Sequence, residues 1–258
     1  MALVSVMSAG GSPGVSALAL GMALTWHRPT VLVDADPTGG QPVLAGWLRG
    51  QVPPTGGVMQ LLTDYRHGDL VEGIDEVGMR LPDTTVTFVP GVRRAAQAGN
   101  LSLIWDRFPT LVQRMDDMGV DVIADVGRMG LEGHATDLVR VSDIVLLVTG
   151  CTLPELSTTR AVVGDGEWAR SSAQTRVVTV GASHPYGRKE VENVLQIPVL
   201  AEVPLDSKGA AVVAHGMAPG RRWQSSPYVR GVKAVSVATQ EAIDVRRRRI
   251  GTEEVTDG

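Results

Sequence analysis

The sequence predicts an α/β protein with a doubly wound, mainly parallel sheet flanked by helices. Short, almost continuously apolar segments recur along the chain, as is typical of strands buried on both faces, and segments with helical spacing separate them. A glycine-rich turn joins the first apolar segment to the first helical one. With 258 residues, of which 43% are hydrophobic, the chain is long enough for one large core. We expect a single domain over residues 1–250 and a disordered acidic tail over 251–258.

The expected strands are short apolar runs bounded by turn residues. They cover residues 2–7, 30–33, 85–89, 120–125, 144–149, 175–180 and 197–203. The expected helices cover residues 17–26, a turn at 58–62, and residues 101–118, 153–163, 188–195 and 228–249. Because strands that alternate with helices run parallel, their carboxyl ends should meet at one edge of the sheet.

Composition limits the classes of function. A net charge of -4 gives no overall attraction to nucleic acid or to an anionic membrane. The single cysteine, Cys151, excludes an intrachain disulfide and fits a reducing compartment. No apolar run reaches the roughly 18 residues that cross a bilayer. We therefore expect a cytoplasmic protein, with recruitment to a membrane or nucleoid site as a further expectation.

The turn over residues 8–16 reads SAGGSPGVS and lies between the first strand and the first helix. That context is typical of a phosphate-binding P-loop, G-x-x-x-x-G-K-[ST], whose backbone N–H groups, lysine and hydroxyl hold phosphate and Mg²⁺. Gly14 and Ser16 match the motif, whereas Ala9 and Val15 replace its first glycine and its lysine. Lysine occurs only at positions 189, 208 and 233, so no neighbouring lysine is out of register.

The candidate nucleotide-binding residues share this turn and are Gly10, Gly11, Ser12, Gly14, Val15 and Ser16. The alternative is a tight strand-to-helix turn in which the glycines serve close packing.

Carboxylates lie at the carboxyl ends of two of the expected strands. The second strand is followed by Asp34 and Asp36, and the strand over 120–125 ends in Asp125. After a P-loop-like start, an acid in the place of Asp125 is the Walker B arrangement that holds Mg²⁺. Asp34 or Asp36 alone is also compatible with a turn before Pro37.

Five segments in this order resemble the ParA/MinD family of P-loop ATPases over essentially the whole chain. They are GGSPGVS (10–16), VLVDADP (31–37), VIADV (122–126), SDIVLLV (142–148) and IPVLAEVP (197–204). The resemblance implies the P-loop NTPase fold of ParA/MinD type. It also implies that Ser16 ligates Mg²⁺, that Asp125 is the Mg²⁺-linked acid, and that Asp36, in an active member, positions the attacking water.

Two departures from the family pattern concern charge. Gly10 occupies the place of the family's signature lysine and Val15 that of the P-loop lysine. A charge-assisted contact contributes about 1.5–3 kcal/mol, so each missing lysine weakens binding by roughly tenfold to a hundredfold. Phosphoryl transfer depends on the same charges and should suffer more. We expect weak binding of Mg-ATP or Mg-ADP, or none.

The first hypothesis is therefore a pseudo-ATPase with a degenerate Walker A loop, similar to TadZ/CpaE-like proteins that position pilus or secretion machinery. It would form a homodimer and recruit an unidentified protein partner. The second hypothesis is an active ATPase for chromosome or plasmid partitioning or for cell-site positioning. In that case an arginine replaces the lysine, and the candidates are Arg28, Arg93, Arg94 and Arg128.

A third hypothesis is an NAD(P)-dependent oxidoreductase. Gly10 and Gly14 open the first helix, and Asp34 lies 20 residues after Gly14, where a ribose-binding acid is expected. The Tyr-x-x-x-Lys pair of short-chain dehydrogenases is absent, because Tyr186 and Lys189 are three residues apart. This hypothesis is the least favoured of the three.

The last expected helix ends in four arginines, Arg246, Arg247, Arg248 and Arg249. One interpretation is a packed helix whose cations suit the negative end of its dipole. The other is a phosphate-contacting patch for non-specific DNA or anionic lipid, by analogy with family members.

Overall fold

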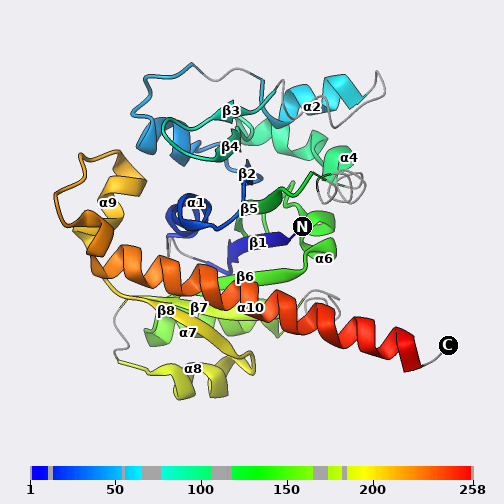
Figure 1. The fold of residues 1–258 in the computed structure, drawn as a ribbon, viewed down its shortest axis with the longest axis vertical. Coiled ribbons are helices and arrows are strands. Elements are labelled where there is room, and N and C mark those ends of the chain that lie inside the picture. Colours follow the sequence, from blue (N-terminus) through cyan, green and yellow to red (C-terminus); the bar gives the residue numbers. More distant parts are fainter. Residues whose placement is uncertain are drawn as a thin grey trace.

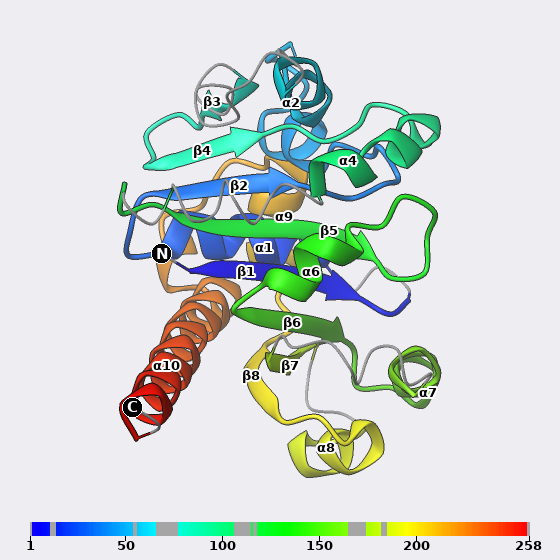
Figure 2. The same cartoon turned by 90° about the vertical axis from the view of Figure 1, so that its right-hand side faces the viewer.

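The computed structural model describes residues 2–10, 14–53, 56–65, 77–105, 115, 118–164, 174–181 and 185–256. Its strands form one eight-stranded sheet in the order β3-β4-β2-β5-β1-β6-β7-β8. Figure 2 shows the strands in that order from top to bottom. In the described part of the chain all strand pairs are parallel except β3 with β4. The predicted α/β class, with a doubly wound and mainly parallel sheet, is confirmed.

The strands are β1 (Leu3–Ser8), β2 (Thr30–Asp34), β3 (Met79–Arg80), β4 (Val86–Val89), β5 (Asp121–Arg128), β6 (Ile144–Thr149), β7 (Gln174–Val180) and β8 (Val199–Val203). The α-helices are α1 (Val15–Thr25), α2 (Val58–Tyr65), α4 (Ser102–Trp105), α6 (Thr136–Val141), α7 (Leu153–Val163), α8 (Arg188–Leu195), α9 (Ser207–His215) and α10 (Pro227–Thr256). Shorter turns are the π-helix η1 (Val43–Trp47) and the 3₁₀-helices η2 (Ala95–Asn100) and η4 (Trp223–Ser225). Figure 1 labels most of these elements.

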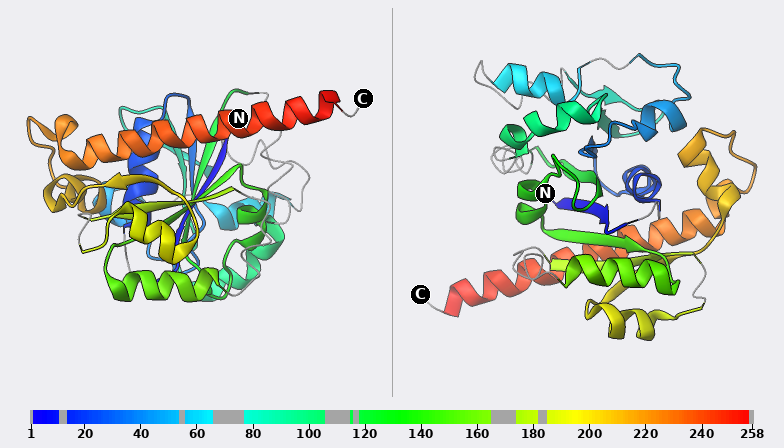
Figure 3. Two further views of the ribbon diagram at one scale, coloured as in Figure 1. Left: turned by 90° about the horizontal axis from the view of Figure 1, so that it is seen from below. Right: turned by 180° about the vertical axis from the view of Figure 1, so that it is seen from behind.

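Two apolar cores cover the two faces of the sheet. Along β1, Val4 and Val6 pack in one core with α1 and α10, whereas Leu3 and Met7 pack in the other core with α4 and α6. This alternation follows from the two-residue period of a strand. In the left view of Figure 3, α10 (red) lies on one side of the sheet and α7 (green) on the other. The continuous apolar runs in the sequence reflect this burial on both faces.

Several elements differ from the expected boundaries. β5 does not end at Asp125 but continues to Arg128, with a register shift against β1 between Val6 and Met7. Helix α9 was not expected, although its N-cap signal is present: the Asp206 side chain accepts a hydrogen bond from the N–H of Gly209 at 2.9 Å. Of the helix expected over 101–118, the short α4 is described and most of the remainder lies outside the described residues.

Helix α10 is longer than expected, because it continues to Thr256 rather than ending at Arg249. One interior glycine, Gly251, costs only about 1 kcal/mol relative to alanine, which a 30-residue helix tolerates. The four arginines therefore lie inside the helix, and the interpretation that they neutralise its C-terminal dipole is wrong. The assignment of one domain over 1–250 followed by a tail stays a prediction.

Helix α10 is attached to the helix that follows the glycine turn. The buried Tyr228 hydroxyl donates a hydrogen bond to the carbonyl of Ala17 in α1 at 2.8 Å. Since a buried hydrogen bond contributes about 1 kcal/mol, Tyr228→Phe is expected to lower the free energy of unfolding by about that amount in urea titrations. Tyr186→Phe is the control, because no hydrogen bond from the Tyr186 hydroxyl to another described residue is present. Equal losses in the two variants would contradict this prediction.

Candidate nucleotide-binding site

Three segments named by the sequence motifs converge at the carboxyl edge of the sheet. β5 lies between β1 and β2, and its Asp125 is in register with Val6 of β1 and with Asp34 of β2. The glycine turn after β1 leads into α1, and the chain after β2 leads to Asp36. The parallel pairing of these three strands therefore brings Ser16, Asp36 and Asp125 into one region.

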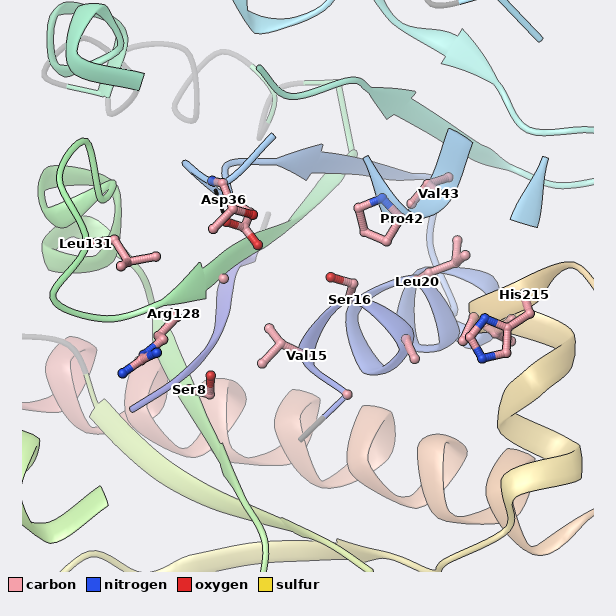
Figure 4. A pocket seen from close by; sticks show the side chains of 16 residues that line it. Ser8, Val15, Ser16, Leu20, Asp36, Pro42, Val43, Arg128, Leu131 and His215 are labelled. Atoms are coloured by element: carbon pink, nitrogen blue, oxygen red, sulfur yellow. Dashed lines mark hydrogen bonds between the residues drawn. The ribbon is translucent and has the colours of Figure 1, made fainter. Parts of the chain in front are cut away.

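A cavity of about 650 Å³ opens at this edge, and Figure 4 shows its walls. It is lined by Ser8, Gly14, Val15, Ser16, Ala17, Leu20, Asp36, Thr38, Pro42, Val43, Gly127, Arg128, Leu131, Val213, Ala214 and His215. Four of the sequence-predicted site residues are among these. Gly11 and Ser12 lie outside the described residues. Gly10 does not line the cavity but packs against α7, where a Cβ on it would lie 2.5 Å from the Cγ2 atom of Thr158.

Ser16 and Asp125 form a hydrogen-bonded pair beside the cavity. The Ser16 hydroxyl donates to the Asp125 carboxylate, and the N–H of Gly127 donates to the same carboxylate at 3.1 Å. Burial raises the pKa of the Asp125 carboxyl to about 7; the Ser16 hydrogen bond acts against this shift and the charge of Asp36 adds to it. A desolvated carboxylate gains from a bound cation.

This pair fits Mg²⁺ through its hydroxyl and carboxylate oxygens. Among the described residues, no group of three or more histidine, cysteine, aspartate or glutamate side chains is arranged to hold a metal ion. Mg²⁺ at Ser16 and Asp125 would therefore need phosphate oxygens and water as its remaining ligands, which is its usual mode with nucleotides.

Asp34 and Asp36 differ in position although they are two residues apart. Asp34 is buried against Gly91, where a Cβ would lie 2.6 Å from the Asp34 carboxyl carbon. Burial and the charge of Asp125 raise the pKa of the Asp34 carboxyl well above its usual range. Asp36 is half-buried and lines the cavity, and its carboxylate accepts a hydrogen bond from the N–H of Thr38 at 2.8 Å. Asp34 does not line the cavity, so it is not placed to bind a ribose there.

The lysine position of the P-loop motif is apolar. Val15 lies on the cavity wall, its side chain belongs to the core that includes α1 and α10, and only 7% of its surface is exposed. The preceding Gly14 has a φ of 88°, a left-handed conformation that favours glycine. The turn therefore has a glycine where the backbone requires one, but Val15 supplies no charge.

The sequence did not indicate two features in and near the cavity, namely its end at α9 and η1, and His134. The end formed by α9 and η1 is apolar apart from His215, and it was missed because neither element was expected. His134 lies near Asp36, and burial lowers the pKa of its imidazole to about 4 although the charge of Asp36 opposes this. Its Nε2 atom is buried without a hydrogen-bond partner among the described residues. An isolated histidine in a loop gives no pattern by which it could have been selected.

The arginines at the end of α10 are partly engaged within the protein. Arg246 donates to the backbone carbonyl of Asp143, and Arg247 pairs with the Asp143 carboxylate at 3.3 Å. Arg248 donates to the carbonyl of Asp244 at 3.2 Å. Contact of this segment with DNA or anionic lipid stays a prediction. Of the helices in the described part of the chain, none combines the length and apolarity needed to cross a membrane.

Comparison with known proteins supports the fold. No protein-family model matches the sequence, and a search of curated proteins finds no relative. Among solved structures, a ParA family ATPase from Chlorobium tepidum is similar with a TM-score of 0.72 at 13% identity, covering 92% of this chain and 97% of that chain. A chain of the MinC:MinD cell division protein complex from Aquifex aeolicus is similar with a TM-score of 0.71 at 12% identity, covering 93% of this chain and 96% of that chain.

A third structure is the septum site-determining protein MinD from Pyrococcus horikoshii, complexed with Mg-ADP. It is similar with a TM-score of 0.68 at 15% identity, covering 91% of this chain and 94% of that chain. The chain therefore has the fold of ParA/MinD-type P-loop ATPases, as the ordered sequence motifs predict.

Proposed function

We propose that this chain is a ParA/MinD-type partition or positioning protein with a degenerate Walker A loop. In this proposal it is a homodimeric scaffold that localises a protein partner of pilus, secretion or partition type, as expected for a TadZ/CpaE-like protein, and does not turn over ATP. The observation that carries the proposal is Val15, an apolar side chain on the cavity wall in the position where the P-loop motif places its lysine.

The charge balance of the cavity supports the absence of turnover. A nucleotide brings about three or four negative charges to a site where Asp36 and Asp125 are already acidic and Val15 is neutral. Mg²⁺ at Ser16 and Asp125 would neutralise part of this charge. The loss of a lysine contact removes about 1.5–3 kcal/mol from binding, and catalysis by positioned charge depends on the same contact. The proposal therefore includes weak Mg-ATP or Mg-ADP binding without hydrolysis.

The fold supports the scaffold part of the proposal. The similar Aquifex aeolicus structure is a complex of MinD with MinC, so the same fold presents a surface for a protein partner there. The position of Asp34 weighs against the oxidoreductase hypothesis, because its carboxylate is buried against Gly91 rather than on the cavity wall.

Phosphate release from ATP by the full chain tests the proposal. We expect the wild type and Asp36→Ala to release phosphate at the same rate, that of the buffer with ATP alone, because Val15 replaces the P-loop lysine whose charge assists the transfer. Sedimentation of the wild type should show a dimer. Steady phosphate release that Asp36→Ala abolishes would overturn the proposal and favour the active partition ATPase, and a monomer at all concentrations would overturn its dimeric part.

A further inference from the structure

The structure separates the four arginines that the sequence offers as replacements for the missing lysine. Arg28 lies at the amino-terminal edge of the sheet, where it pairs with Asp121 at 3.2 Å beside the start of β5. Arg93 and Arg94 follow β4 at the carboxyl edge, but neither lines the cavity. Arg128 lines it. The order in which the strands pair, which cannot be read from the sequence, therefore places only Arg128 of these four candidates on the cavity wall.

Arg128 is placed beside the beginning of the glycine turn. It is the last residue of β5 and is in register with Ser8, the last residue of β1. The N–H of the following residue, Met129, donates to the Ser8 carbonyl at 2.8 Å, which holds the two chain segments together. Figure 4 shows Arg128 on the side of the cavity where Ser8 and Val15 lie, away from His215.

The Arg128 guanidinium is available to a ligand. The residue is exposed, and its side chain makes no hydrogen bond or ion pair with the other described residues. An arginine presents a planar set of N–H donors that matches two phosphate oxygens and stays charged at any physiological pH. Arg128 is an exposed cation on the wall of a cavity whose other titratable lining side chains are one carboxylate, Asp36, and one histidine, His215. It is therefore the counter-charge that this wall offers to an anionic ligand.

We infer that Arg128 binds the phosphate groups of a nucleoside diphosphate or triphosphate in this cavity and takes over part of the role of the missing P-loop lysine. The inference rests on the proposed function insofar as that function includes nucleotide binding. The Arg128 guanidinium would contact the phosphates from the end of β5, whereas the lysine of a P-loop does so from the glycine turn. Ser16 and Asp125, with Mg²⁺, would neutralise the same phosphates from the α1 side, so the ligand would lie between two positive centres.

Calorimetric titration of the full chain with Mg-ADP tests this inference. Arg128→Gln is expected to weaken binding tenfold or more, because it removes a charge-assisted contact from the ligand. Arg128→Lys should recover part of the loss, since it keeps the charge but not the planar donor set. The matched control is Arg94→Gln, an exposed arginine at the same edge of the sheet and outside the cavity wall, which should bind within twofold of the wild type.

Thermal melts of the variants check the fold. Arg128→Gln should melt at the wild-type temperature, because the Arg128 side chain makes no hydrogen bond or ion pair with the other described residues. Competition by Mg-pyrophosphate in the wild type, weakened equally by Arg128→Gln, would support recognition of phosphate rather than of the base. The inference is overturned if Arg128→Gln binds Mg-ADP within twofold of the wild type, or if the wild type does not bind Mg-ADP. The second result leaves the scaffold function intact, since phosphate release and sedimentation test that function separately.

Discussion

Val15→Lys is expected to strengthen Mg-ADP and Mg-ATP binding by tenfold to a hundredfold. The variant places an ammonium group at the wall of the cavity that Asp36 also lines, beside the α1 N-terminus. A contact between a charged donor and phosphate contributes about 1.5–3 kcal/mol, which corresponds to this change in Kd. Calorimetric titration of wild type and variant under the same Mg²⁺ concentration measures it.

Val15→Met is the matched control, because it adds comparable length without charge and should leave Kd within twofold. Gly10→Lys is not an equivalent test. A side chain at Gly10 first meets Thr158 of α7, so that variant changes packing as well as charge. Unchanged binding in Val15→Lys, or an equal gain in Val15→Met, would show that charge at position 15 is not what limits binding.

Asp125→Asn is expected to stabilise the metal-free protein above pH 7, with the gain disappearing as the pH falls towards 4. Burial raises the pKa of Asp125 to about 7 in the folded state from 3.8 in the unfolded chain. Between these values the folded state holds a proton that the unfolded chain has lost, so stability falls as the pH rises through this window. Each unit by which the folded-state pKa exceeds the unfolded-state pKa lowers the free energy of unfolding above pH 7 by about 1.4 kcal/mol. Asparagine carries no charge and avoids this loss.

Urea unfolding in EDTA at intervals from pH 4 to pH 8 measures the difference between wild type and Asp125→Asn. The wild type and the variant must be compared because other groups also make the free energy of unfolding depend on pH. The carboxyl of Asp34 has a raised pKa as well, whereas burial lowers the pKa of His134, which gives the opposite pH dependence. Asp137→Asn, which removes an exposed carboxylate paired with Arg140 at 3.0 Å, is the control and should differ little from the wild type throughout. A difference for Asp125→Asn that is the same at all pH values would contradict the prediction.

The sequence predicts much of this fold because buried parallel strands require continuous apolar runs. β1, β2, β6 and β7 are found within one or two residues of their expected bounds for that reason. Helix α9 was missed because it is short and follows a strand and a proline without a long periodic pattern. The extension of β5 to Arg128 was missed because it depends on pairing with β1, and Gly127 within it resembles a turn residue.

The site was less predictable than the fold. Asp34 and Asp36 follow the same strand, and only the packing of the neighbouring loops shows that one carboxylate is buried against Gly91 while the other faces the cavity. Arg128 could not be selected among four arginines because its place depends on strand order. The roles of the turn residues and of Asp36 and Asp125 stay predictions, to be decided by the binding and phosphate-release measurements.

The backbone conformation of Gly127 and its closeness to Asp36 limit which residues position 127 can accept. It has a φ of 70°, and a Cβ on it would lie 2.4 Å from the carboxyl carbon of Asp36. Any larger residue must both adopt a strained backbone and displace that carboxylate from the cavity wall. In a saturation-mutagenesis screen for ligand binding, position 127 should therefore be as intolerant as a ligand-contacting position, although a glycine has no side chain with which to bind. Its sequence constraint would come from the space that Asp36 occupies.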